Sequence, residues 1–190
     1  MTDGTPGWRR SGPLWAAAGL ALLLAAAGLW AFQPWRLFTT RAVEEALPRA
    51  APPAAEREAD PAAGEERPED GESAPDEPVV LGEGGFLTQE HATSGTATVL
   101  ELADGSRYVR LTDLATSDGP DLHVWITDQE AGGDWSKYRD GRYVALGPLK
   151  GNEGDANYEI PADAELDGMA SVVIWCDRFS VAFGSAPVEL

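Results

Sequence analysis

The sequence predicts an all-β domain, an antiparallel β-sandwich or barrel, preceded by one transmembrane helix and a disordered linker. Three observations support this division. An uncharged apolar stretch of 19 residues lies near the N-terminus, and an acidic segment rich in proline and alanine follows it. From residue 84 onward, aromatic residues return, and short alternating runs are separated by glycine, proline and aspartate turns. Such closely spaced strands and turns are typical of all-β domains.

The overall composition excludes several classes of function. The chain has 14 Lys and Arg against 32 Asp and Glu, a net charge of −18, which disfavours binding to nucleic acid. A single cysteine, Cys176, excludes an intrachain disulfide, a CxxC redox motif and a multi-cysteine zinc site. No G-x-S-x-G phrase, P-loop or D-x-D-x-D-G calcium loop is present, so a hydrolase, an NTP-using enzyme and a calcium site are not predicted.

Residues 14–32 are predicted to cross the lipid bilayer. As a helix they would span roughly 28 Å, about the thickness of a hydrocarbon core. Trp15 and Trp30 lie near the two ends, where aromatic rings favour the membrane interface. A cleaved signal peptide is an alternative, because Arg9-Arg10 and the alanines at 25–27 fit one, but its apolar core is usually shorter. A twin-arginine export signal is a further alternative, although the residues flanking the arginine pair fit it poorly.

The predicted location is the cell membrane, with a single crossing. Arginines flank the span almost equally, Arg9 and Arg10 before it and Arg36 and Arg41 after it, so positive charge alone leaves the orientation open. The short N-terminal tail, residues 1–13, favours a cytoplasmic N-terminus. The remainder of the chain would then lie outside the cytoplasm.

Residues 33–83 are predicted to be a disordered linker that holds the domain away from the membrane. From Thr39 to Glu83 there are seven prolines, no aromatic residue, and 13 acidic against four basic residues. Such a segment buries too little apolar surface to offset the entropy lost on ordering. A short helix over 41–47, continuing the membrane helix, is an alternative for its first part.

Residues 84–190 are predicted to form the folded domain. Asp104-Gly105 lies between two alternating runs, a strong hairpin signal, and Pro161 marks the end of a strand. We expect His123 at the rim of the domain and the rings of Trp125 and Trp175 in its core. The predicted strands are 96–102, 108–111, 122–127, 143–146, 157–160, 171–176 and 179–183.

Several phrases of this domain occur together, in order, in one known family. They are Gly85-Phe86, His91-x-x-Ser94-Gly95-x-Ala97, Gly119-Pro120-Asp121-Leu122-x-Val124, Leu146-Gly147-x-Leu149-Lys150-Gly151, Gly154-x-x-x-Tyr158-x-Ile160-Pro161, Ser171-Val172-Val173-Ile174-Trp175-Cys176 and Phe179-x-Val181-x-Phe183-Gly184-x-Ala186. From residue 85 to about 187 the chain thus resembles the DM-thirteen family, also called electron-transfer DM. The resemblance implies an extracytoplasmic β-sandwich and a redox role centred on the cysteine, which here is Cys176.

Cys176 has one structural and three functional interpretations. A cysteine that ends an apolar strand often packs as a small core residue. A redox thiol needs a nearby cation, and Arg178 would share its face if the strand continued, whereas a turn at 177–178 would remove that relation. An intermolecular disulfide is also open, because the thiol has no partner within the chain.

Cys176 would need further ligands to hold a metal or haem. His91 and His123 are the only imidazoles in the chain, and together with Met169 they resemble the ligand types of an electron-transfer copper site. The order of the residues differs from such sites, where the ligands cluster near the C-terminal end. Haem, with Cys176 or His91 as axial ligand, is the other cofactor considered.

The function predicted is therefore a membrane-anchored, extracytoplasmic protein with a redox or electron-transfer role at Cys176. Its partners would be the bilayer, through residues 14–32, and a redox partner protein. The alternative is a non-catalytic surface module for binding or assembly, in which Cys176 is structural.

Overall fold

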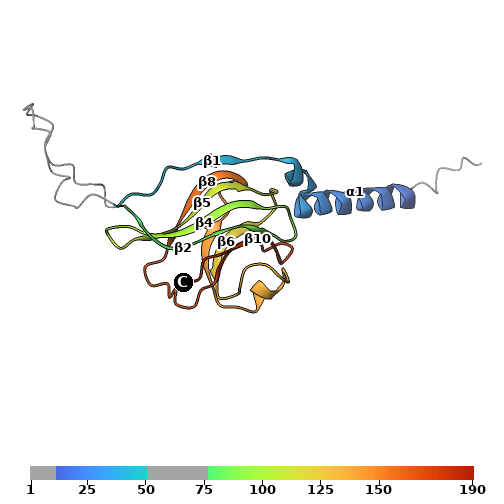
Figure 1. The fold of residues 1–190 in the computed structure, drawn as a ribbon. Helices are drawn as coiled ribbons and strands as arrows, with labels where there is room; N and C mark the ends of the chain where they lie inside the picture. Colours follow the sequence, from blue (N-terminus) through green and yellow to red (C-terminus); the bar gives the residue numbers. More distant parts are fainter. Residues whose placement is uncertain (1–11, 51–76) are drawn as a thin grey trace, which may run out of the picture.

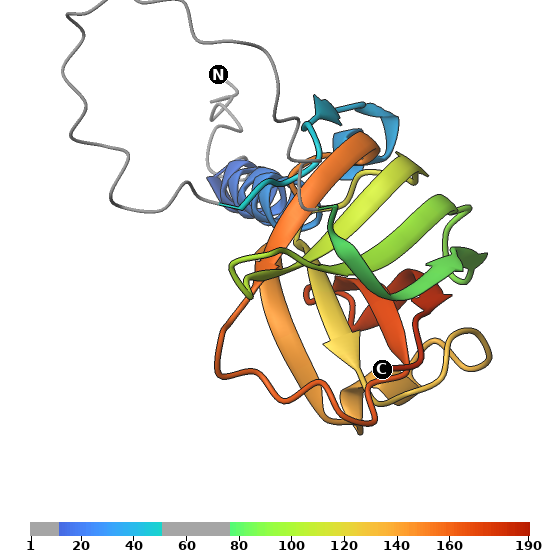
Figure 2. The ribbon, with the colours of Figure 1, turned by 60° about the vertical axis from the view of Figure 1, so that its left-hand side comes forward.

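Two five-stranded sheets pack face to face in the computed structural model, which describes residues 12–50 and 77–190 (Figure 1, Figure 2). This arrangement is a β-sandwich, and all strand pairs but one are antiparallel. The first sheet contains, in spatial order, β1 (Ala42–Glu44), β8 (Glu153–Ile160), β5 (Arg107–Ala115), β4 (Ser94–Glu101) and β2 (Val79–Gly85). The second contains β3 (Leu87–Thr88), β10 (Val181–Pro187), β9 (Ser171–Cys176), β6 (Leu122–Thr127) and β7 (Tyr143–Pro148).

The main core lies between the sheets. Alternate residues of β4 and β5 point inward, and β6 and β9 supply the facing layer. All six residues of β9 are buried, because it lies between β10 and β6 and is covered on both faces. The fully buried aliphatic residues of this core include Val99, Val109, Leu111, Val124, Ile126, Val172 and Ile174.

A second apolar cluster covers the outer face of the β9 sheet. Trp125, Val173 and Trp175 belong to it, as does Tyr138, which comes from the loop between β6 and β7. The Tyr138 hydroxyl donates to Ser185 Oγ at 2.9 Å, which ties the loop to β10. The prediction that both tryptophans are core residues is therefore correct, although they lie in this second cluster and outside the main core.

The N-terminal helix, α1 (Gly12–Phe32), projects from one end of the sandwich (Figure 1). It carries no acidic residue in its first turn and no basic residue in its last, and its leucines are exposed. The stretch Leu14–Arg36 is long and apolar enough to cross a membrane. A short 3₁₀ helix, η1 (Pro34–Phe38), follows directly.

The predicted linker, residues 33–83, is ordered at both of its ends. After η1 the chain forms β1, which pairs in parallel with β8, and β2 begins at Val79. Residues 51–76 lie outside the described part of the chain, as do residues 1–11 of the predicted cytoplasmic tail. Composition could not reveal β1, because its stability comes from an edge provided by residues more than a hundred positions away.

Close packing of β1 depends on glycine. A Cβ atom at Gly151 would collide with the Arg41 carbonyl and the Val43 side chain, and one at Gly154 would collide with the Val43 carbonyl. The Asn152 side chain accepts a hydrogen bond of 2.7 Å from the Arg41 N–H. The segment that follows η1 is therefore a strand, and the alternative of a short helix over 41–47 is wrong.

The other predicted strands agree well with the structure. β6 and β9 have the predicted bounds, and Asp104-Gly105 forms the turn between β4 and β5, with Gly105 at φ 80°. β8 ends at Ile160, directly before Pro161. The last strand begins at Val181, two residues later than predicted, because the chain first reverses through a turn at 177–180 with Ser180 at φ 54°.

Candidate functional site around the buried cysteine

Cys176 ends β9 and faces the main core. Its side chain has no exposed surface, and its cross-strand partners are Leu122 on β6 and Val181 on β10. The next residue, Asp177, starts the turn into β10. The thiol is therefore covered on one side by core side chains and at the strand end by this turn, which we name the sulfur-covering turn (residues 177–180).

The backbone around the thiol opposes the effect of its burial. Burial raises the pKa of Cys176, and the charge of Asp121 raises it further. Hydrogen bonds from the backbone of Phe179, Arg178 and Asp121 lower the pKa, but burial prevails. The group is therefore a neutral thiol at physiological pH, surrounded by backbone donors that would stabilise negative charge on sulfur.

The Arg178 side chain points away from the thiol. Because the strand stops at Cys176, the alternation that would place Arg178 on the cysteine face is lost. Its Nη1 atom donates instead to the carbonyl oxygen of Ala31, at 3.0 Å, in the last turn of α1. The contribution of Arg178 to the thiol comes through its backbone.

His91 lies in the loop between β3 and β4 and is half-buried. Its ring packs on Phe183, with the centroids 3.9 Å apart and the planes at 36°. Burial lowers the pKa of His91, and the charge of Glu90 opposes this shift only in part. Among the described residues, the one group of three or more side chains that could hold a metal ion contains neither His91 nor Cys176.

His123 lies at the rim, as expected, between two carboxylates that the sequence analysis did not select. Its Nε2 atom is 3.0 Å from Asp121 Oδ1 and 3.5 Å from Asp177 Oδ2. The three donor atoms lie within 4.8 Å of one another and could hold a metal ion. The cluster was missed because Asp121 and Asp177 meet only through the pairing of β6 with β9, which the Asp177 N–H reinforces by donating to the Asp121 carbonyl at 3.0 Å.

A stack of aromatic rings leads from this rim across the outer face of the sheet. Trp175 pairs with His123 across the strands, and its ring stacks on Trp125 with the centroids 4.9 Å apart. Trp125 in turn stacks on Tyr143 at 4.1 Å, and Tyr143 is exposed. The stack lies on the opposite face of β9 from Cys176, because neighbouring residues of a strand alternate in direction.

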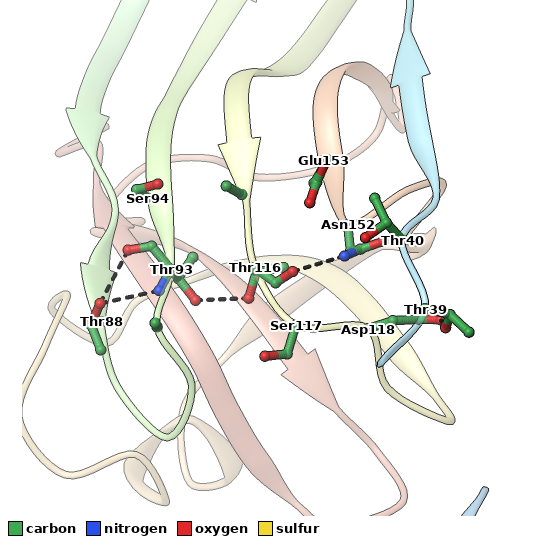
Figure 3. A pocket seen from close by; sticks show the side chains of 12 residues that line it. Thr39, Thr40, Thr88, Thr93, Ser94, Thr116, Ser117, Asp118, Asn152 and Glu153 are labelled. Atoms are coloured by element: carbon green, nitrogen blue, oxygen red, sulfur yellow. Dashed lines mark hydrogen bonds between the residues drawn. The ribbon is translucent and has the colours of Figure 1, made fainter. Parts of the chain in front are cut away.

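A polar cleft of about 540 Å³ lies where the segment after η1 meets the first sheet (Figure 3). Hydroxyl groups dominate it, and Thr93 Oγ1 and Thr116 Oγ1 are 2.9 Å apart. Thr116 also accepts a hydrogen bond of 2.8 Å, through its carbonyl, from Asn152 Nδ2. At one end Thr39 donates to Asp118 at 2.9 Å. Its described lining contains neither cysteine nor histidine, so what the cleft offers is a set of hydroxyl, amide and carboxylate groups that form hydrogen bonds.

These features define a β-sandwich module that carries one buried thiol and follows an apolar helix long enough to cross a membrane. Comparison with family models identifies the module more closely. The chain belongs to the electron transfer DM13 family, whose model matches residues 85–188, more than half of its length. The searches of curated proteins and of solved structures returned no match. The resemblance to the DM-thirteen family inferred from the sequence is thus confirmed.

Proposed function

We propose that this protein is a single-pass, membrane-anchored electron-transfer protein whose sandwich lies outside the cytoplasm and whose redox group is Cys176. Membership of the electron transfer DM13 family supports the class of function, and the apolar stretch Leu14–Arg36 supports the anchor. The feature that supports the role of Cys176 is the backbone of Phe179, Arg178 and Asp121, which lowers the pKa of the thiol, although burial keeps that pKa raised overall.

Burial means that Cys176 reacts only when its cover opens. The sulfur-covering turn is the solvent-facing part of this cover, since Asp177, Arg178 and Phe179 are all exposed. With hydrogen peroxide as oxidant, the sulfur would take one oxygen atom, the O–O bond would break, and the other oxygen would leave as water. The product is a sulfenic acid, which an added thiol reduces again.

The test uses the full chain in detergent, because β1 and η1 belong to the described structure. Purified protein is treated with hydrogen peroxide, analysed by mass spectrometry for one added oxygen at Cys176, and then reduced with dithiothreitol. Visible absorbance of the untreated protein reports bound haem or copper. Reversible oxidation, or absorbance that Cys176→Ser abolishes, supports the proposal. The absence of both signals in the folded protein would refute the proposal.

The burial of Cys176 favours a second candidate, a non-catalytic module for binding or assembly at the cell surface. Its cysteine would then act only as a core residue, as its place in the main core indicates. In that case Cys176→Ser lowers the free energy of unfolding by about 1 kcal/mol and changes no redox property. The two candidates thus differ in the outcome of the same experiment.

The proposed orientation has its own test. A cysteine at an exposed position of the sandwich, such as Ala103, placed in a Cys176→Ser background, should react with a membrane-impermeant maleimide in intact cells. Labelling only after lysis would place the domain inside the cytoplasm and overturn the extracytoplasmic part of the proposal.

A further inference from the structure

We propose that the sulfur-covering turn rests in the interface of the bilayer that α1 crosses, with Phe179 at the boundary between headgroups and acyl chains. This inference depends on the membrane anchor proposed above and goes beyond it, because it assigns a lipid-contacting surface to the sandwich itself. The occupant of this surface is the lipid of the same leaflet in which α1 ends.

Direct contacts join the turn to the end of α1. The rings of Phe179 and Phe32 are stacked, with the centroids 6.0 Å apart and the planes at 13°. Arg178 Nη1 donates to the carbonyl of Ala31 at 3.0 Å, one of the carbonyls that a helix end leaves without an intrahelical partner. The turn therefore lies at the depth of the last helical residue, which ends the span and so belongs at the interface.

A second set of contacts fixes the neighbouring loop to the segment after α1. Arg36 Nη1 donates to the Gly119 carbonyl at 2.9 Å, and it lies 3.8 Å from Asp118 Oδ1. Thr39 donates to the other oxygen of the same carboxylate at 2.9 Å. Together with the pairing of β1 and β8, these contacts leave no free spacer between the helix and the sandwich. This end of the domain must therefore lie at the membrane surface.

The side chains at this end suit an interface. Phe32, Trp35 and Phe179 keep 59%, 50% and 44% of their surface exposed, although large aromatic rings are normally buried in water-soluble proteins. Aromatic rings beside arginines, here Arg36 and Arg178, are favoured at the level of lipid headgroups. Next to them, the carboxylate of Asp177 is directed toward His123, at 3.5 Å.

The experiment uses the full chain in nanodiscs of phosphatidylcholine and phosphatidylglycerol. A spin label is attached at Phe179→Cys in a Cys176→Ser background, and a control label at Ala103→Cys. Ala103 belongs to the turn between β4 and β5, at the end of the sandwich remote from α1 (Figure 1). Collision rates with oxygen and with a water-soluble nickel chelate are then measured for both labels.

The label at position 179 should collide several-fold less with the nickel chelate, relative to oxygen, than the label at position 103. Equal ratios in a chain that has integrated into the discs would overturn the interface contact and leave the anchor intact. A chain that fails to integrate at all would overturn both.

An unaltered chain provides a second measurement in case the double variant does not fold. In discs that contain a phosphatidylcholine with a photoreactive diazirine near its headgroup, the peptide with residues 177–180 should form lipid adducts after illumination. Adducts absent from that peptide, but present on α1, would contradict the inference.

Discussion

Cys176 and Trp175 are neighbours in β9, yet they face opposite sides of the sheet and belong to different apolar clusters. The thiol faces the main core, whereas the indole joins the aromatic stack on the outer face. Any redox chemistry at Cys176 therefore occurs away from this stack and close to the sulfur-covering turn. At the scale of single residues, access to the sulfur is the property that decides its chemistry.

We expect Cys176 to react with a maleimide many-fold more slowly in the folded protein than in denaturant. Burial raises the pKa of Cys176, so the native state favours the neutral thiol. The raised pKa also decides how the stability of the fold depends on pH. The contribution of the Cys176 thiol to stability is complete below the pKa of the unfolded thiol, and it is lost as the pH rises through the pKa of the folded thiol. The rate of maleimide labelling in the folded and in the denatured protein, followed by mass spectrometry, tests the expected slower reaction, with Cys176→Ser as the unlabelled control. Equal rates in the two states would contradict it.

Gly184→Ala should lower the free energy of unfolding by about 1–3 kcal/mol, the usual cost of overpacking a core. An added Cβ would lie 2.6 Å from two carbon atoms of the Thr93 side chain. Thr93 cannot move easily, because its hydroxyl is bonded to the Phe183 carbonyl and to Thr116. Gly85→Ala is a matched control, since the nearest atom to its Cβ would lie at 3.9 Å. Urea unfolding of the two variants measures the difference, and similar losses in both would refute the steric explanation.

At the scale of elements, β1 is the least expected feature. It comprises three residues and gains its stability from contacts with β8 and from Glu45, which follows it. Glu45 pairs with Lys150 Nζ at 2.9 Å and accepts a hydrogen bond of 2.7 Å from the Asn157 N–H. This short strand connects the helix to the sandwich.

Gly151→Ala should release β1 while the sandwich stays folded. The added methyl group would collide with the Arg41 carbonyl, a backbone atom that cannot rotate away. Hydrogen exchange of residues 42–45 measures the release, and Gly85→Ala again serves as the control. Unchanged protection in Gly151→Ala would show that β1 docks without this close approach.

Acidification should also weaken the attachment of β1. Burial raises the pKa of Glu45, but the hydrogen bonds from Lys150 and Asn157 prevail and hold it below its usual value of 4.5. A lowered pKa means that this stabilisation is present above pH 4.5 and is lost as the pH falls through the folded value. The protection of residues 42–45 against hydrogen exchange, corrected for the slower intrinsic exchange at low pH, should therefore fall in acid more in the native protein than in Glu45→Gln. Glu44→Gln, which leaves Glu45 unchanged, should keep the native response.

At the scale of the whole molecule, the helix and the sandwich form one continuous arrangement in the described residues. The segment from Pro34 to Glu44 leads from α1 directly to the edge of the first sheet, and the predicted spacer between membrane and domain is not found there. β1 and β2, which follow each other in the order of described strands, form the two opposite edges of the first sheet. The sulfur-covering turn consequently lies beside the end of the helix.

A chain that begins at Glu77 should fold into the sandwich but associate through β8. Without β1, the backbone groups of β8 at 153–155 lose their partner, and an open strand edge favours pairing with a second copy. Light scattering after size-exclusion chromatography should detect dimers or larger species, and thermal unfolding should occur at a lower temperature than for the full chain in detergent. A monomer as stable as the full chain would contradict this role of β1.

The sequence by itself determined an all-β domain, a sandwich or barrel, together with the apolar helix and most strands, because alternation, turn residues and a long uncharged run are local signals. It placed β6, β9 and the turn at Asp104-Gly105 correctly for that reason. The ordered phrases from residue 85 to about 187 indicated the family. Only the tertiary structure decided how strands distant in the chain meet. Their pairing creates β1, gathers Asp121 with His123 and Asp177, and directs Arg178 to the helix and away from Cys176. These features depend on contacts between remote segments, which the pattern along one strand does not encode.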